Sequence, residues 1–200
     1  APMAGVASFS ILGDVTQQIG GARVKVTTLV GADQDAHAYH MTAGDVQKIR
    51  AAKLVLLNGL GLEKAEFKRA VEQNKIPYAA VSDGVSTLKM TEEHDNHHSD
   101  HKGHNHSDLD PHVWHDPLRM FTYAANVANA LIKVDPQGKA YYLQRLNTYH
   151  GELKNLHIYA SQQFNAVPKS KRKVLTGHGA FGYMGKRYDI QFIAPQGLNT

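Results

Sequence analysis

Short apolar runs alternate with segments of helical periodicity along most of the 200-residue chain, and this alternation limits the fold more than any other feature. Parallel strands need a crossover connection, usually a helix, so strands that alternate with helices favour an α/β fold with a parallel sheet. Thr42 and Asp45 have the spacing of a capping box at the start of one predicted helix. In the first half of the chain we predict strands at residues 6–11, 24–30, 54–57 and 78–81, and helices at residues 42–52 and 62–74.

Residues 91–110 (TEEHDNHHSDHKGHNHSDLD) break this alternation. They hold six acidic residues and one lysine, a local charge of −5, with almost no apolar side chain beyond Leu109. Such a composition cannot bury a core, so we expect a solvated loop. Six of the chain's 13 histidines lie in this segment: His94, His97, His98, His101, His104 and His106. Cysteine is absent from the sequence, which excludes disulfides, thiol nucleophiles and cysteine-based zinc sites within it.

The second half of the chain predicts a helix at 117–134 and one long helical pattern at about 137–166. Roughly thirty residues at about 1.5 Å each would span about 45 Å, which suits a helix that connects two bodies. Strands at 172–176 and 190–194 then flank a helix at 180–188. Because a two-stranded sheet is marginally stable, we expect the second lobe to be truncated in this sequence, with an exposed apolar edge that tends to associate. The predicted domains are an N-terminal α/β lobe (1–134), a linking helix (135–167) and the start of a C-terminal α/β lobe (168–200).

Three histidines outside the loop lie at strand-to-helix or loop-to-helix junctions, where α/β folds bind their ligands. His37 follows the second predicted strand, His112 lies in Asp110-Pro111-His112-Val113-Trp114, and His178 ends the fifth strand. Any one of them could be an ordinary surface or capping histidine. Three at equivalent junctions favour a metal site, because neutral imidazole is a good zinc ligand and three or four make a tight site.

These motifs resemble a known family, the ZnuA/TroA-like (cluster A-I) zinc-binding subunits of bacterial ABC importers. The most specific match is Asp110 to Trp114; Asp35-Ala36-His37 and His178 with Ala180-Phe181-Gly182-Tyr183 also fit. The resemblance implies that His37, His112 and His178 bind the metal between two lobes, with a fourth, carboxylate ligand beyond residue 200. It also implies a periplasmic protein, its signal peptide already removed, that delivers Zn²⁺ to a permease in the inner membrane.

Two departures from the family pattern add imidazoles near the predicted site. His40 stands where the family usually has an acid and His115 where it has an apolar residue, so both are candidates for additional metal ligands. Three imidazoles favour Zn²⁺, although Mn²⁺, Cu²⁺ or Ni²⁺ would also bind in vitro. The histidine loop has two interpretations of equal weight, a capture site that passes zinc to the cleft or a dispensable solvated insert.

Two other functions stay open at this stage. A three-histidine zinc hydrolase would use an open water position, with Glu63 or Asp35 as the base. A histidine-rich zinc buffer without a transport partner would keep most of its affinity in the loop. We expect no enzyme activity, no nucleic-acid partner, no small organic substrate, and a monomer when the protein is full length. The Gly177-x-Gly179-x-x-Gly182 pattern resembles a dinucleotide-binding motif but lacks the acidic residue expected after the next strand. We therefore expect these glycines to leave space for the backbone around His178.

Overall fold

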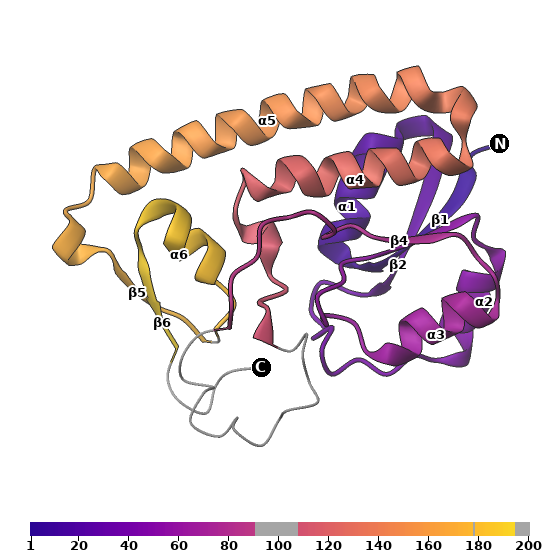
Figure 1. Cartoon of the computed structure of the whole chain (residues 1–200), viewed down its shortest axis with the longest axis horizontal. Coiled ribbons are helices and arrows are strands. Elements are labelled where there is room, and N and C mark those ends of the chain that lie inside the picture. The colour runs from indigo at the N-terminus through magenta and orange to yellow at the C-terminus, as the bar shows by residue number, and fades with distance from the viewer. Residues whose placement is uncertain (91–107, 178, 195–200) are drawn as a thin grey trace.

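The computed structural model describes residues 1–90, 108–177 and 179–194 (Figure 1). Its larger sheet has four parallel strands in the order β2-β1-β3-β4. The strands are β1 (Met3–Phe9), β2 (Val24–Val30), β3 (Leu54–Leu57) and β4 (Tyr78–Ala80). The helices of this part of the chain are α1 (Ser10–Gly20), α2 (Ala43–Ala51), α3 (Ala65–Gln73) and α4 (Arg119–Val134). The predicted α/β fold with a parallel sheet is confirmed.

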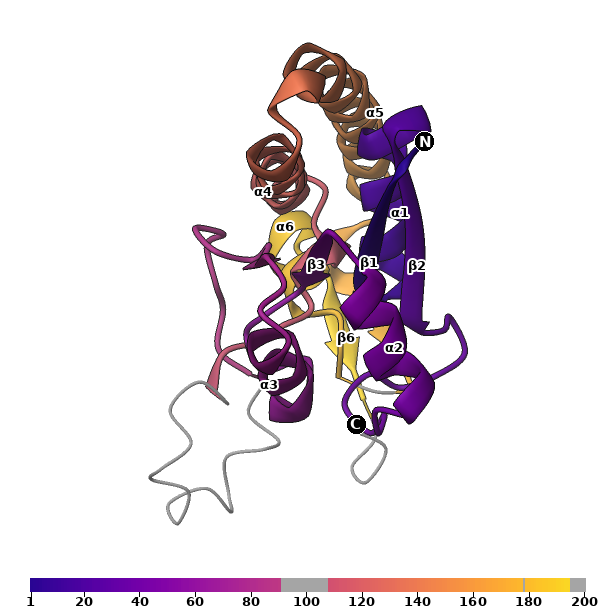
Figure 2. The same cartoon turned by 90° about the vertical axis from the view of Figure 1, so that its right-hand side faces the viewer.

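The strand order places helices on both faces of this sheet. The chain passes from β1 to the neighbouring β2 through α1 and then returns across β1 to β3 through α2. Because such crossovers are right-handed, α1 covers one face, and α2 and α3 cover the other. Helix α4 packs beside α1, and the long helix α5 (Lys139–Asn165) lies against both (Figure 2).

The core of the protein lies in and around the two central strands. All four residues of β3 are buried, as a parallel strand covered on both faces requires. Leu12 and Ile19 of α1 and Val127 of α4 are fully buried against the sheet. The carboxyl ends of β1 and β3, from which the next loops start, are therefore packed in the core.

Helix α2 begins as predicted. The Thr42 hydroxyl accepts a hydrogen bond from the Asp45 amide (3.1 Å), and the Asp45 carboxylate accepts one from the Thr42 amide (3.0 Å), which completes the capping box.

Several predicted boundaries were wrong, among them the start of the first strand, which is Met3 and not residue 6. The strand expected to run to residue 11 ends at Phe9, and Ile11 belongs to α1; the apolar run continues across the junction and hides the change of period. The helix expected from residue 62 begins at Ala65, because Lys64 before it has an extended backbone (φ −66°, ψ 153°) and serves as its N-cap.

The second sheet contains β5 (Lys173–Leu175) and β6 (Gln191–Ile193), which are parallel and connected by α6 (Gly182–Tyr188). Figure 1 shows that α5 spans the distance between the larger sheet and this second one. Its 27 residues correspond to about 40 Å. All three residues of β5 are exposed, and the side chain of Leu175 is among the most exposed apolar groups described. The expected exposed apolar edge is present, whereas association through it stays a prediction. Among the described residues, no helix has the length and apolar character needed to cross a bilayer.

Candidate metal centre

A cleft of about 500 Å³ opens at the carboxyl ends of the central strands of the larger sheet. It is lined by Phe9 at the end of β1, by Ser10 and Ile11 at the start of α1, by residues 31–37 after β2, and by Leu62 after β3. The chain leaves β1 toward β2 on one side and β3 lies on the other, so the cleft is at the topological switch point of the sheet. Open α/β sheets bind ligands at this position.

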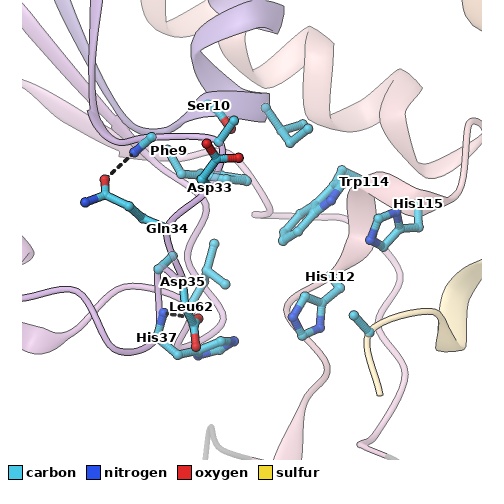
Figure 3. Close-up of a pocket in the computed structure, with 15 residues that line it drawn as sticks. Phe9, Ser10, Asp33, Gln34, Asp35, His37, Leu62, His112, Trp114 and His115 are labelled. Carbon is cyan, nitrogen blue, oxygen red and sulfur yellow. Dashed lines mark hydrogen bonds between the residues drawn. The ribbon is translucent and has the colours of Figure 1, made fainter. Parts of the chain in front are cut away.

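His37 reaches the cleft from the loop after β2 (Figure 3). The Asp35 carboxylate accepts a hydrogen bond from the His37 amide (2.9 Å), which fixes the turn that carries the ring. The His37 Nε2 atom is buried and has no hydrogen-bond partner in the described part of the chain. Burial, and then the nearby His112 ring, lower the pKa of His37 below its usual value. A ring that stays neutral keeps a lone pair for a metal ion.

His112 is held by the carboxylate of Asp110, and both residues are buried. Asp110 Oδ1 accepts hydrogen bonds from the His112 amide (2.9 Å) and from His112 Nδ1 (2.7 Å). In the neutral ring, this contact with the carboxylate places the proton on Nδ1 and leaves the lone pair on Nε2. A carboxylate that orients a histidine in this way is typical of zinc ligands. The His112 and His37 rings lie edge to face with their centroids 5.5 Å apart.

A buried polar network supports the loop that carries His112. The Asn58 side chain donates a hydrogen bond to the Pro111 carbonyl (3.0 Å), and the Tyr123 hydroxyl donates one to Asn58 Oδ1 (2.9 Å). Glu63 in turn accepts hydrogen bonds from the Asn58 and Gly59 amides, at 2.6 and 3.0 Å. Asp110 belongs to the predicted motif, but sequence reasoning assigned it no role of its own; its contact with His112 spans only two residues. Sequence reasoning assigned no role to Asn58 either, and the contacts of Asn58 with Pro111 and Tyr123 are tertiary.

The two additional candidate ligands differ in their placement. His115 lines the cleft, with its ring 5.4 Å from Trp114 and 4.6 Å from Phe181, centroid to centroid (Figure 3). The structure does not bring His40 to the cleft. The His40 side chain is 80% exposed and lies 3.2 Å from the Lys64 ammonium and 3.9 Å from Glu66. After the Asp35–Ala38 turn the chain runs toward the α2 cap, and this carries residue 40 away from His37.

His178 and the loop histidines His94, His97, His98, His101, His104 and His106 lie outside the described residues. Ala180, two residues after His178, lines the cleft. Within residues 1–90, 108–177 and 179–194, no group of three histidine or acidic side chains is close enough to hold a metal ion. The described part of the centre therefore supplies two adjacent imidazoles, His37 and His112.

The two carboxylates considered as a hydrolytic base have structural contacts. Glu63 accepts the two backbone hydrogen bonds given above and a third from the Ser8 hydroxyl (2.6 Å), and it is not among the residues that line the cleft. Burial raises the pKa of Glu63 even though these hydrogen bonds act in the opposite direction. Asp35 lines the cleft, but its Oδ1 accepts a hydrogen bond from the His37 amide.

Comparison with known proteins identifies close relatives over nearly the whole chain. The family model for the zinc-uptake complex component A, periplasmic (ZnuA), matches residues 6–200. The metal ABC transporter substrate-binding lipoprotein SloC of Streptococcus mutans is 32% identical over 98% of this chain and 63% of its own length. The manganese ABC transporter substrate-binding lipoprotein PsaA of Streptococcus pneumoniae is 34% identical over 98% of this chain and 62% of its own length. The chain thus spans somewhat less than two thirds of these relatives.

Solved structures show the same fold. The periplasmic zinc-binding protein TroA from Treponema pallidum superposes with a TM-score of 0.85 and 27% identity, over 100% of this chain and 69% of that protein. A manganese-bound periplasmic metal-binding protein from Candidatus Liberibacter asiaticus gives a TM-score of 0.81 and 28% identity, over 99% of this chain and 71% of its own.

Proposed function

The chain belongs to the zinc-uptake complex component A (ZnuA) family, and from this premise we propose that it captures Zn²⁺ in the periplasm and delivers it to an ABC-type permease of the inner membrane. One observation carries the proposal. His112, oriented by the buried Asp110, lies beside His37, whose buried Nε2 has no hydrogen-bond partner in the described part of the chain, at the switch point of the sheet. Two adjacent imidazoles with available lone pairs suit a cation better than an organic ligand.

We assign His37, His112 and His178 as the metal ligands. The placement of Ala180 in the cleft supports a position for His178 nearby. His115 is the candidate for an additional nitrogen ligand, since it lines the same cleft. A carboxylate from the remainder of a longer protein, or water, would otherwise complete the coordination.

Zinc is the proposed cargo because of the ligand type. Three imidazoles suit Zn²⁺, whereas an oxygen-rich set would favour Mn²⁺. The names of relatives divide on this point, since PsaA is named for manganese and TroA for zinc. Competition between the two ions is therefore part of the test below.

The function proposed is binding and transport, not catalysis. Of the two carboxylates that a zinc hydrolase could use as its base, Glu63 accepts three hydrogen bonds away from the cleft and Asp35 holds the His37 turn. We also propose that release needs only a small rotation between the two sheets. They are connected by α5, an unbroken helix whose single interior glycine is Gly151.

We further propose that the six loop histidines capture zinc and pass it to the cleft. The support comes from where the segment joins the described chain. Met90 donates a backbone hydrogen bond to Asp108 (2.8 Å), and Asp110 donates one to Leu88 (2.8 Å). Both ends of the segment thus meet beside Asp110, two residues from His112.

The test of the main proposal is metal binding by chelator competition with Zn²⁺ and with Mn²⁺. His37→Ala, His112→Ala and His178→Ala are each expected to lower zinc affinity by at least about 100-fold, more than a typical outer-shell change costs. His40→Ala is the matched control and should bind as the unmodified protein does. Equal affinity in His40→Ala and His112→Ala, or tighter binding of Mn²⁺ than of Zn²⁺, would contradict the proposal.

Deleting residues 92–108 tests the capture role separately. Loss of the additional zinc equivalents and slower loading of the cleft are expected, with the affinity of the cleft itself retained. If stoichiometry and loading rate both stay unchanged, the segment is a dispensable insert. If most of the affinity disappears, the protein is a histidine-rich buffer.

A further inference from the structure

Asp110 occupies a central position between the metal cleft and α6. Its carboxylate holds the His112 ring, and the residue is only 2% exposed. Its backbone carbonyl points to a different neighbour, the hydroxyl of Tyr183, which donates a hydrogen bond of 2.6 Å. Asp110 therefore connects His112, through its side chain, with Tyr183, 73 residues away in sequence, through its main chain.

The Tyr183 hydroxyl also accepts a hydrogen bond from the Leu88 amide (3.0 Å). Leu88 and Asp110 are themselves paired through the backbone. The Tyr183 hydroxyl of α6 thus bonds to both of the paired backbone segments, one at Leu88 and the other at Asp110. Because Tyr183 is completely buried, its hydroxyl is shielded from water that would compete for these partners.

Polar contacts anchor α6 in this position. The Arg119 guanidinium lies 4.6 Å from the centroid of the Tyr183 ring. Arg187, one turn further along α6, pairs with the fully buried Asp116 at 3.1 Å, and Arg119 pairs with the same carboxylate at 2.6 Å. Gly182 allows the first turn of α6 to lie close to Asp110, since a Cβ at this position would be 3.1 Å from Asp110 Oδ2.

From this geometry we infer that Tyr183 is a positioning residue for the metal ligand His112, acting through Asp110. A shift of α6 moves the Tyr183 hydroxyl, the hydroxyl moves the Asp110 main chain, and the Asp110 carboxylate turns the His112 ring. Metal held by His112 is in this way sensitive to the placement of the second sheet, which α6 connects. The inference rests on the proposed function for its consequence.

The test compares Tyr183→Phe with Tyr142→Phe, which removes the hydroxyl of another fully buried tyrosine, one that donates to Asp135 and does not line the cleft. Two quantities are measured: the ¹⁵N ring signals of His112 in the metal-free protein, and Zn²⁺ affinity by chelator competition. Tyr183→Phe is expected to mix the two His112 tautomers and to lower zinc affinity about tenfold, the lower end of outer-shell effects. Tyr142→Phe should leave both quantities unchanged.

Gly182→Ala provides a second variant, which keeps the hydroxyl and pushes the first turn of α6 away from Asp110. It should change the His112 ring signals in the same direction, with a smaller loss of affinity. Unchanged His112 signals in both Tyr183→Phe and Gly182→Ala, or an equal loss of affinity in Tyr142→Phe, would overturn the inference. If the unmodified protein binds no zinc, the proposed function fails, and the ring signals of the metal-free variants still decide the role of Tyr183.

Discussion

The two sheets of this protein are built in different ways. The four-stranded sheet is covered by helices on both faces, and all residues of its strand β3 are buried. The second sheet has two strands, β5 and β6, among residues 108–177 and 179–194, and every residue of β5 is exposed. The first sheet holds His37 and His112 through its own loops, whereas the second reaches the cleft through the contacts of α6 with Asp110 and Asp116. Within the described residues, the loops of the larger sheet thus supply both imidazoles of the cleft, and polar contacts attach α6 to the loop that carries His112.

The largest effect is expected at Asp116, where these two regions meet. Its carboxylate is fully buried between Arg119 and Arg187, so Asp116→Ala leaves two cations without their partner. We expect the free energy of unfolding to fall by about 3–5 kcal/mol, measured by urea denaturation. Asp14→Ala, at an exposed position on α1, should change it by less than about 0.5 kcal/mol. A similar small change in both variants would mean that the Asp116 contacts do not join the regions.

A matched pair of leucine substitutions tests the difference in burial. Leu56 lies in β3 with 1% exposure, and Leu175 lies in β5 with 73% exposure. Leu56→Ala should cost about 2–5 kcal/mol, because it removes packed atoms and leaves a cavity. Leu175→Ala should change the free energy of unfolding by about 0.5 kcal/mol or less. Equal costs in thermal or urea unfolding would show that the second sheet is buried in solution.

The smallest effect is expected at the junction of the larger sheet with α5, where Asp135 pairs with Arg23 (2.9 Å). Hydrogen bonds from Arg23 and then from Tyr142 lower the pKa of Asp135 below its usual value. A carboxyl whose pKa is lowered by folding stabilises the protein above its unfolded pKa, and this contribution is lost as the pH falls through the folded pKa. The difference in unfolding free energy between the unmodified protein and Asp135→Asn should therefore be largest near neutral pH and narrow on acidification. If the difference in unfolding free energy between the two proteins is the same at every pH, the Arg23–Asp135 pair does not stabilise the fold.

Local sequence signals predicted much of the fold. The capping box of Thr42 and Asp45 and the apolar run at β3 each depend on neighbouring residues alone, and both are confirmed. The start of α1 at Ser10 could not be predicted, since apolar residues continue through it. The positions of His37 and His112 at strand-to-helix or loop-to-helix junctions indicated both residues as candidate metal ligands. The role of Asn58 depends on contacts with Pro111 and Tyr123, 53 and 65 residues away, for which no local pattern exists.

The central claim is that His37, His112 and His178 bind one ion. Anomalous scattering at the zinc edge from zinc-loaded crystals tests it most directly. The predicted result is a single strong peak within about 2.0–2.1 Å of Nε2 of His37 and of His112, with a nitrogen of His178 as a third ligand. Zinc found only on the histidine segment, or a peak in the cleft that contacts neither His37 nor His112, would contradict the claim.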